Sequence, residues 1–172
     1  MHALLVTLGS HGDIHPFIAI ARALRARGHQ ASIATNPYFQ ALIEGEGETF
    51  IPLTERAELK QLIADHKVMD PLWGPMAVMR TLVLPYVPQF VQTTRDLLRQ
   101  HRFDVLVYHP IVIGASWAAA MEGVKTVSVC PSPIMWATPA DQIALMPHRS
   151  HAPGPRTVRF DMWLGRQFLR LL

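Results

Sequence analysis

The sequence has 172 residues, of which 49% are hydrophobic and 17% are charged, and its formal net charge is +3. This composition suits a single globular domain with a sizeable apolar core and excludes a mostly disordered chain. The one cysteine, Cys130, excludes an internal disulfide framework and is typical of a reducing, cytoplasmic compartment. No recognised nucleic-acid-binding module accompanies the small positive charge, so nucleic acid is not an expected partner.

The N-terminal residues predict the first half of a βαβ unit. Residues 3–8 are almost entirely apolar, as in a strand buried on both faces, and a glycine-containing loop follows at residues 9–13. After Pro16, apolar residues recur with helical spacing until Gly28 ends the pattern. The initial apolar run is too short for a signal peptide or a membrane span.

The same alternation of strands and helices continues along the chain. Asn36 and Pro37 predict the start of a second helix, as its N-cap and first residue. This order is typical of an α/β fold with a Rossmann-like, doubly wound parallel sheet. Further strands are expected at residues 31–35, 49–52, 103–108 and 125–129, and a helix of small side chains at residues 114–122.

The stretch between the third and fourth predicted strands has a different pattern. Thr54 is expected to cap a short amphipathic helix that ends before Pro71. Residues 72–90 follow with Arg80 as their single charge, and this run is long enough to suggest a transmembrane helix. Because the run contains three prolines, it predicts instead a kinked helix packed on the domain.

The C-terminal residues predict a connector and a final helix. We expect residues 1–155 to form the Rossmann-like domain and residues 156–172 to form an amphipathic helix that begins an interdomain connection. This helix has no capping residue at its end, which suggests that the chain is part of a longer one. Arginines outnumber acidic residues in it, so an anionic membrane surface is a candidate partner.

The loop after the first predicted strand carries the reactive groups. Ser10, His11 and Asp13 present a hydroxyl, an imidazole and a carboxylate beside a helix N-terminus, groups suited to removing a proton near a phosphate-bearing ligand. Spacing alone slightly favours Asp13 as a helix N-cap worth about 1 kcal/mol. A dinucleotide site would need G-x-G-x-x-G and an acidic residue where the second strand ends, at Thr35-Asn36. A nicotinamide-dependent oxidoreductase is therefore a disfavoured alternative, and no spacing indicates a metal site.

Three motifs carry a family resemblance. They are G-S-H-G-D-I-H-P from Gly9, L-R-A-R-G-H from Leu24 and A-T from Ala34. Together they resemble the N-terminal half of GT-B nucleotide-sugar glycosyltransferases. The branch includes sterol glucosyltransferases, glycopeptide-antibiotic glycosyltransferases and bacterial rhamnosyltransferases of glycolipid synthesis. The resemblance is strongest over residues 1–52, becomes looser up to residue 139, and covers one domain.

The resemblance implies an inverting transfer of a sugar from a nucleotide diphosphate donor to a hydroxyl of a lipid, sterol or polyketide-like acceptor, without a metal or cofactor. It makes Asp13 the expected catalytic base. His11, which stands where many relatives carry arginine, is the second catalytic candidate, with a solvated loop residue as an equal alternative. Ser10 and Gly12 are candidates for contacts with the donor phosphates, and ordinary turn chemistry is the favoured alternative for the serine. The second GT-B domain would be the intramolecular partner that holds most of the donor. This chain alone is therefore expected to have little activity.

Flat aromatic and flexible methionine side chains suit an apolar acceptor. For the methionines and tryptophans, ordinary packing in the core is the favoured alternative. His109 follows a predicted strand at its carboxyl end, and the sequence does not distinguish a cleft-lining histidine there from a hydrogen-bonded histidine in the core. A non-catalytic acceptor-binding or membrane-associated subunit is the remaining alternative function. The expected location is the cytoplasm, with the inner face of the membrane as a peripheral position. The acceptor-site candidates are Trp73, Met76, Met79, Arg80, His109 and Trp136.

Overall fold

The computed structural model describes residues 1–55 and 74–132, together with residues 159 and 163. The chain divides into two units, Met1–Pro131 and Ser132–Leu172, and the sheet belongs to the first. The predicted short helix after Thr54, the connector and the domain boundary at residue 155 lie outside the described residues, as does most of the predicted C-terminal helix.

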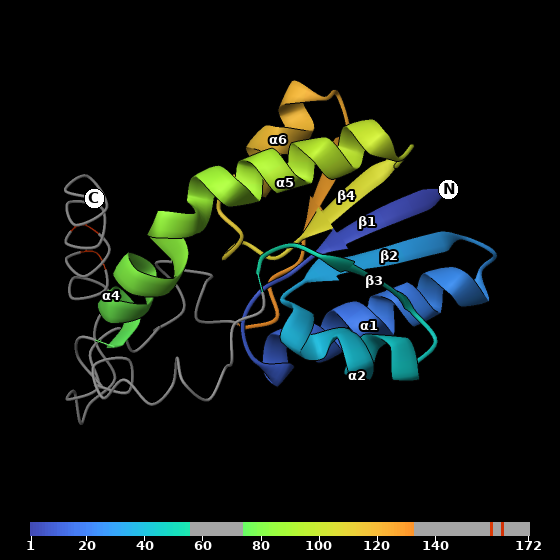
Figure 1. Cartoon of the computed structure of the whole chain (residues 1–172), viewed down its shortest axis with the longest axis horizontal. Coiled ribbons are helices and arrows are strands. Elements are labelled where there is room, and N and C mark those ends of the chain that lie inside the picture. The colour runs from blue at the N-terminus through green and yellow to red at the C-terminus, as the bar shows by residue number, and fades with distance from the viewer. Residues whose placement is uncertain (56–73, 133–158, 160–162, 164–172) are drawn as a thin grey trace. The chain divides into compact units, whose positions relative to one another are not determined.

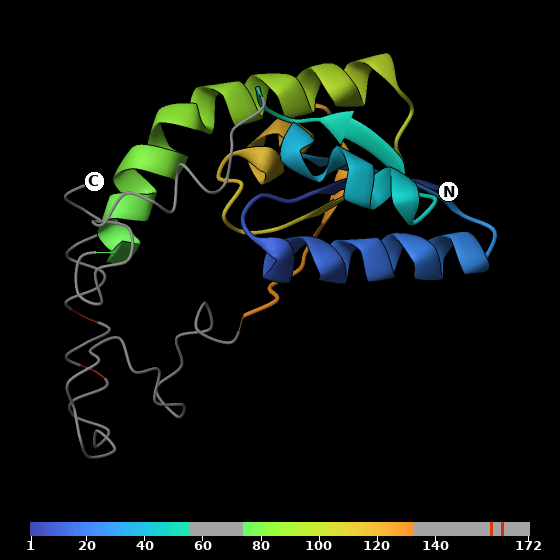
Figure 2. The ribbon, with the colours of Figure 1, turned by 60° about the horizontal axis from the view of Figure 1, so that its bottom comes forward.

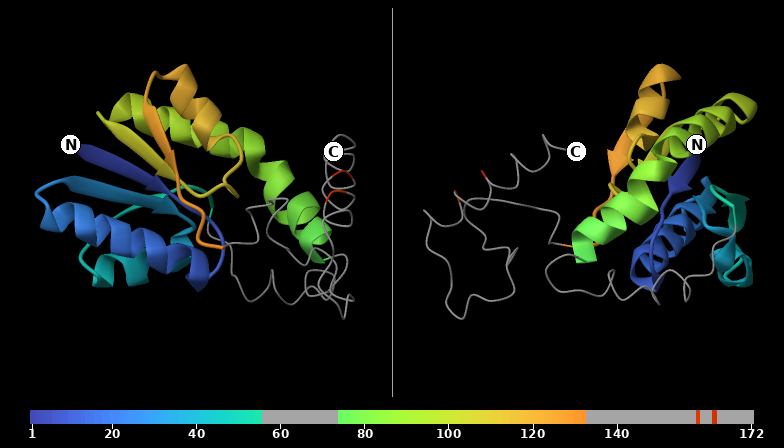
Figure 3. Two further views of the ribbon diagram at one scale, coloured as in Figure 1. Left: turned by 180° about the vertical axis from the view of Figure 1, so that it is seen from behind. Right: turned by 60° about the vertical axis from the view of Figure 1, so that its left-hand side comes forward.

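Among the described residues, five parallel strands form one sheet in the order β3-β2-β1-β4-β5 (Figure 1). Seen from behind, β5 lies beside β4 at one edge (Figure 3). The predicted α/β fold with a Rossmann-like, doubly wound parallel sheet is confirmed. The strands are β1 (His2–Val6), β2 (Gln30–Thr35), β3 (Thr49–Pro52), β4 (Val105–Tyr108) and β5 (Lys125–Ser128).

Helices cover both faces of the sheet. Helices α1 (His11–Ala26) and α2 (Gln40–Gly45) lie on one face, and α5 (Val87–Gln100) and α6 (Ala115–Met121) lie on the other (Figure 2). Side chains of β1 point alternately into the two cores, because successive residues of a strand face opposite sides. Leu5 packs in the core with Phe17 of α1, and Leu4 packs in the core with Phe90 of α5. Burial of both faces explains why the strand has no alternating polar residues.

Helix α1 begins at His11, earlier than the start after Pro16 that the apolar pattern predicted. Ser10 is its N-cap and Asp13 is its third residue, so Asp13 is not the N-cap. Asp13 accepts the backbone N–H of Ser10, as in a capping box, and this favours an early helix start. Pro16 lies inside the helix, where its ring leaves the carbonyl of Gly12 without its usual N–H donor.

The helix predicted from Asn36 begins as a short 3₁₀ turn, η1 (Pro37–Phe39), and continues as α2. Asn36 is the N-cap that the sequence predicted, because its Oδ1 accepts the backbone N–H of Tyr38 at 2.9 Å. The turn places Tyr38 and Phe39 just after the carboxyl end of β2. They therefore flank the first turn of α1, as their ring contacts with His11 show.

A kinked helical run precedes β4, as the prolines predicted (Figures 1 and 2). Pro85 and Pro88 have no N–H, so regular α-helical hydrogen bonding is interrupted near them. Leu84 instead donates to the carbonyl of Met79, five residues earlier. In the part of the chain that the structure describes, no helix is long and apolar enough to span a bilayer. The run consists of α4 (Gly74–Val78), the π-helical η2 (Met79–Val83), the 3₁₀ turn η3 (Leu84–Tyr86) and α5.

Candidate functional site

Two loops meet at the carboxyl ends of the central strands β1 and β4. Val6 and Tyr108 are register partners in these strands, and the backbone N–H of His109 donates to the carbonyl of Val6 at 2.9 Å. After β1, the buried hydroxyl of Thr7 donates to the backbone carbonyl of Asp13 at 3.1 Å. These bonds hold Asp13 and His109 at the edge where ligands bind in open α/β sheets.

One oxygen of the Asp13 carboxylate is held by two hydrogen bonds from Ser10. The backbone N–H and the hydroxyl of Ser10 both donate to Asp13 Oδ2, at 2.7 and 3.0 Å. The side chain remains 27% exposed. Asp13 is therefore fixed in position and still open to a molecule that approaches from solvent.

Gly9 allows the carboxylate to come this close to the loop. Its φ is +131°, a conformation that residues with a side chain rarely adopt. A Cβ at this position would overlap Oδ2 of Asp13 and lie 2.8 Å from its Cγ. Glycine is therefore favoured here both by the backbone conformation and by the closeness of Asp13.

His109 is a buried neighbour of Asp13. Its side chain is only 3% exposed, and its Nδ1 accepts the backbone N–H of Ile111 at 3.0 Å. Its Nε2 lies 3.3 Å from Asp13 Oδ1, a long contact, and has no better-placed partner among the described residues. The structure thus places the predicted acceptor-site residue His109 against the predicted base.

The environment lowers the pKa of Asp13. Partial burial of the carboxyl raises the pKa, but the contact with His109 and the two hydrogen bonds from Ser10 lower it by more. The pKa therefore lies below the ordinary value of 3.8. At neutral pH the group is a carboxylate, which can accept a proton from a hydroxyl only as that hydroxyl becomes acidic.

The other loop residues lie around the first turn of α1. His11 is exposed, and its ring lies edge-on to Phe39 with the centroids 5.1 Å apart. In the described residues, no hydrogen bond or ion pair joins His11 to Asp13. Ser10 and Gly12 lie at the amino end of this helix, where backbone N–H groups favour anions.

Three of the predicted acceptor-site residues have described backbones in the kinked helical run. Met79 is half-buried and Arg80 is exposed in η2, while Met76 belongs to α4. Trp73 and Trp136 lie outside the described residues. Whether these residues form one pocket with Asp13 stays a prediction.

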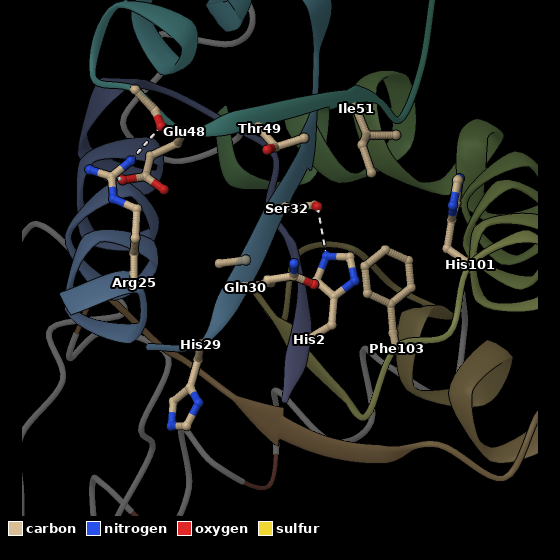
Figure 4. Close-up of a pocket in the computed structure, with 12 residues that line it drawn as sticks. His2, Arg25, His29, Gln30, Ser32, Glu48, Thr49, Ile51, His101 and Phe103 are labelled. Atoms are coloured by element: carbon tan, nitrogen blue, oxygen red, sulfur yellow. Dashed lines mark hydrogen bonds and ion pairs between the residues drawn. The ribbon is translucent and has the colours of Figure 1, made fainter. Parts of the chain in front are cut away.

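A hollow of about 490 Å³ lies at the opposite end of the sheet (Figure 4). It opens at the amino ends of β1, β2 and β3, far along the strands from Asp13. Two pairs of its polar groups already contact each other: His2 Nε2 lies 3.0 Å from Ser32 Oγ, and Arg25 forms an ion pair with the buried Glu48 at 3.0 Å. The hollow is therefore a weaker candidate for chemistry than the edge that carries Asp13.

The sequence did not indicate that His109 and Asp13 touch. The available signal was that each follows a strand at its carboxyl end, and that such ends share one edge of a parallel sheet. Among the described residues, no group of three or more histidine, cysteine, aspartate or glutamate side chains could hold a metal ion.

The sequence is similar to a family of known proteins. The model of the family described as "Glycosyltransferase family 28 N-terminal domain" matches residues 3–118. The chain is 27% identical over 123 residues to a sterol 3-beta-glucosyltransferase of Saccharomyces cerevisiae, covering 69% of this chain and 10% of that protein. It is 40% identical over 67 residues to a sterol 3-beta-glucosyltransferase of Yarrowia lipolytica, covering 38% of this chain and 5% of that protein.

The fold is also similar to solved structures. The crystal structure of the glycosyltransferase VinC in complex with dTDP has a TM-score of 0.63 and 17% sequence identity, covering 91% of this chain and 42% of that chain. The chain therefore spans less than half the length of these relatives.

Proposed function

Because the chain belongs to the glycosyltransferase family 28 N-terminal domain family, we propose that it is the acceptor-binding domain of an inverting glycosyltransferase. The enzyme would move a sugar from a nucleotide diphosphate donor to a hydroxyl of an apolar acceptor. The observation that carries this proposal is Asp13, an ionised and partly exposed carboxylate fixed at the carboxyl ends of the central strands.

In this proposal, Asp13 accepts the proton of the acceptor hydroxyl while that oxygen attacks the anomeric carbon of the sugar. The bond from that carbon to the diphosphate breaks on the opposite side, so the configuration inverts. General-base catalysis of this kind contributes about 10²- to 10⁴-fold to the rate. The low pKa of Asp13 means that proton transfer is late, when the hydroxyl oxygen is already forming its new bond.

A sterol is the acceptor class that the comparisons favour. The relatives from Saccharomyces cerevisiae and Yarrowia lipolytica are named sterol 3-beta-glucosyltransferases. The kinked helical run supports an apolar acceptor, because Met79 is flexible and half-buried and Tyr86 is 45% exposed. We place the acceptor along this run, next to the edge that carries Asp13.

The donor's diphosphate would approach the amino end of α1, near Ser10 and Gly12. The dTDP complex of VinC supports a nucleoside diphosphate as this ligand. The chain spans 42% of VinC, so we propose that most donor contacts come from a second domain of the same polypeptide. A cytoplasmic location, at the membrane face where an apolar acceptor would be reached, remains part of the proposal.

The direct test is an assay of the whole polypeptide that carries this domain. It would be incubated with UDP-glucose or a dTDP-sugar and with ergosterol, and the product analysed by mass spectrometry and by NMR of the anomeric proton. A sterol glycoside with β configuration from an α-linked donor supports the proposal. Retention of the donor configuration would contradict an inverting base at Asp13, and transfer to polar acceptors alone would contradict the acceptor class.

A further inference from the structure

We infer that His109 is a positioning residue for the proposed transfer, holding Asp13 through a hydrogen fixed on Nε2 and taking no proton itself. The inference deepens the proposed function and rests on it. It assigns one atom, Asp13 Oδ1, as the acceptor of the proton.

The backbone determines which nitrogen of His109 carries the hydrogen. Ile111 donates its N–H to Nδ1 at 3.0 Å, so Nδ1 must offer a lone pair and the ring hydrogen belongs on Nε2. Two further backbone bonds hold the residue, since its N–H donates to Val6 and its carbonyl accepts the N–H of Val112, each at 2.9 Å. The backbone of His109 is therefore held at its N–H and its carbonyl, and the N–H of Ile111 holds the ring.

Among the described residues, Asp13 provides the acceptor nearest to the hydrogen on Nε2. Nε2 is buried and lies 3.3 Å from Asp13 Oδ1. The nearest ring on α1 is that of Phe17, with centroids 6.2 Å apart, which offers no acceptor of comparable strength. The distance is within hydrogen-bond range but the two groups are not aligned for a hydrogen bond, so the bond that we infer requires the Asp13 carboxyl to turn toward Nε2.

His109 is poorly suited to relay a proton. Nε2 already carries a hydrogen, so it cannot accept the one that Asp13 takes up. Nδ1 could accept a proton only by giving up its bond from Ile111, and two N–H groups would then face each other in a buried site. His109 therefore holds the carboxylate and keeps its own hydrogen throughout the reaction.

The donors around Asp13 also distinguish its two oxygens. Each carboxylate oxygen has about two lone-pair sites. Ser10 occupies both sites of Oδ2 with its N–H and its hydroxyl. His109 occupies one site of Oδ1, which leaves the other for the acceptor hydroxyl.

The proposed step balances at these atoms. The O–H bond of the acceptor breaks and a bond from its hydrogen to Oδ1 forms. The acceptor oxygen bonds to the anomeric carbon, and the electron pair of the broken carbon–oxygen bond leaves with the diphosphate. The hydrogen on His109 Nε2 stays where it is.

The first test is independent of activity. In the whole polypeptide labelled with ¹⁵N-histidine, NMR should show the ring of His109 with a hydrogen on Nε2 and none on Nδ1, the signal being assigned by its loss in His109→Gln. The pKa of Asp13, followed by the ¹³C signal of its carboxyl, should rise in His109→Phe, which has no donor. In His109→Gln, whose amide can still donate, it should rise less.

The second test is kinetic. His109→Phe should lower kcat by about 10- to 100-fold, the typical effect of losing a hydrogen bond to a charged group. KM for the acceptor should change little, and His109→Gln should recover part of kcat. Circular dichroism and the Tm would show whether each variant is folded, and the NMR of the wild-type protein remains decisive if His109→Phe is not.

The role of His109 and the sugar transfer itself can fail independently in these tests. A hydrogen on Nδ1, or an unchanged Asp13 pKa in a folded His109→Phe, would overturn the inference while sugar transfer by the wild type would still stand. The predicted NMR result without sugar transfer would leave the arrangement intact and reject the proposed function. A rise in acceptor KM with unchanged kcat would also overturn the inference, because it would make His109 a binding residue.

Discussion

Ser10 donates twice to the same oxygen of Asp13, through its backbone N–H at 2.7 Å and its hydroxyl at 3.0 Å. The first bond is part of the N-terminal cap of α1, and the second depends on the serine side chain. One carboxylate thus helps to start the helix and is also the proposed base. Changes at either residue should therefore affect both the stability of the fold and the pH dependence of the reaction.

Replacing Asp13 by asparagine should remove the base. We expect Asp13→Asn in the whole enzyme to lower kcat by about 10²- to 10⁴-fold, since the amide cannot take the acceptor proton. The measurement is steady-state sugar transfer at pH 7. Asp104→Asn is the matched control, because Asp104 also accepts a backbone N–H, from His2, but at the other end of the sheet. Asp104→Asn should keep near-wild-type kcat, and equal losses in both variants would contradict a specific role for Asp13.

Removing the hydroxyl of Ser10 should move the acid limb of the pH–rate profile. Activity requires the ionised carboxylate and is lost as pH falls through the pKa of Asp13. Ser10→Ala removes one of the bonds that lower this pKa, so the acid limb should move to higher pH. The measurement is kcat/KM across pH 3 to 8, and a shift to lower pH would contradict the assigned bond. Ser10→Ala should also lower the stability of the fold, because the bond from the hydroxyl to Asp13 is lost; the hydroxyl accepts no backbone N–H of α1.

Asp13 should also contribute to the pH dependence of stability. Its pKa is lower in the folded chain than the ordinary value of 3.8 expected after unfolding. The stabilisation is therefore complete above the unfolded-state pKa and is lost as pH falls through the folded-state pKa. Urea unfolding of wild type and Asp13→Asn at several pH values should show a difference at pH 6 that shrinks below about pH 4. A difference that grows as pH falls would contradict the lowered pKa.

Alanine variants of Gly9 and Gly28 separate the effect of backbone strain from that of steric overlap with Asp13. Both have positive φ, but an added Cβ would overlap Asp13 at Gly9 and would meet nothing within 4 Å at Gly28. Each alanine variant should lose about 1–3 kcal/mol of stability from backbone strain. Only Gly9→Ala should also lower kcat, because Asp13 must move. The measurements are urea unfolding and sugar transfer, and an unaffected kcat in Gly9→Ala would show that the position of Asp13 is not critical.

Gly114 should be required where α5 and α6 approach each other. A Cβ on Gly114 would overlap Cγ2 of Val91 in α5, whereas one on Gly123 would meet nothing within 4 Å. Gly114→Ala should therefore cost about 1–3 kcal/mol more than Gly123→Ala, which carries the cost of positive φ alone. In a double-mutant cycle followed by thermal unfolding, Val91→Ala should reduce this extra cost. An additive result would show that Val91 is not the obstacle.

The sequence predicted the fold well because its strongest signals are local. The apolar run of β1, the glycine loop and the small residues of α6 each indicate their structure without reference to distant parts of the chain. The start of α1 was placed too late because Pro16 outweighed the weaker signal of Ser10 and Asp13 three residues apart. Capping of this kind is visible in the sequence, but its strength depends on whether the Asp13 carboxylate reaches the backbone N–H of Ser10.

The candidate site was predicted in part. Asp13 and Ser10 belong to one motif, so their proximity follows from the loop. The contact between Asp13 and His109 does not, because it depends on β4 pairing with β1 and on the register that sets Tyr108 opposite Val6. Pairing between strands far apart in the sequence is a property of the whole sheet. The tautomer of His109 was equally hidden, since it depends on the direction of one backbone N–H, that of Ile111.

The position of the pair within the sheet has a consequence for engineering. Asp13 and His109 follow β1 and β4, which both have neighbouring strands on either side, while the described edge strands β3 and β5 contribute to neither residue. Exchanging the loops that follow the edge strands for those of other family members should therefore leave the proposed base and its neighbour His109 in place. Grafting at the two edges of the sheet is thus the safest way to build hybrid domains of this family.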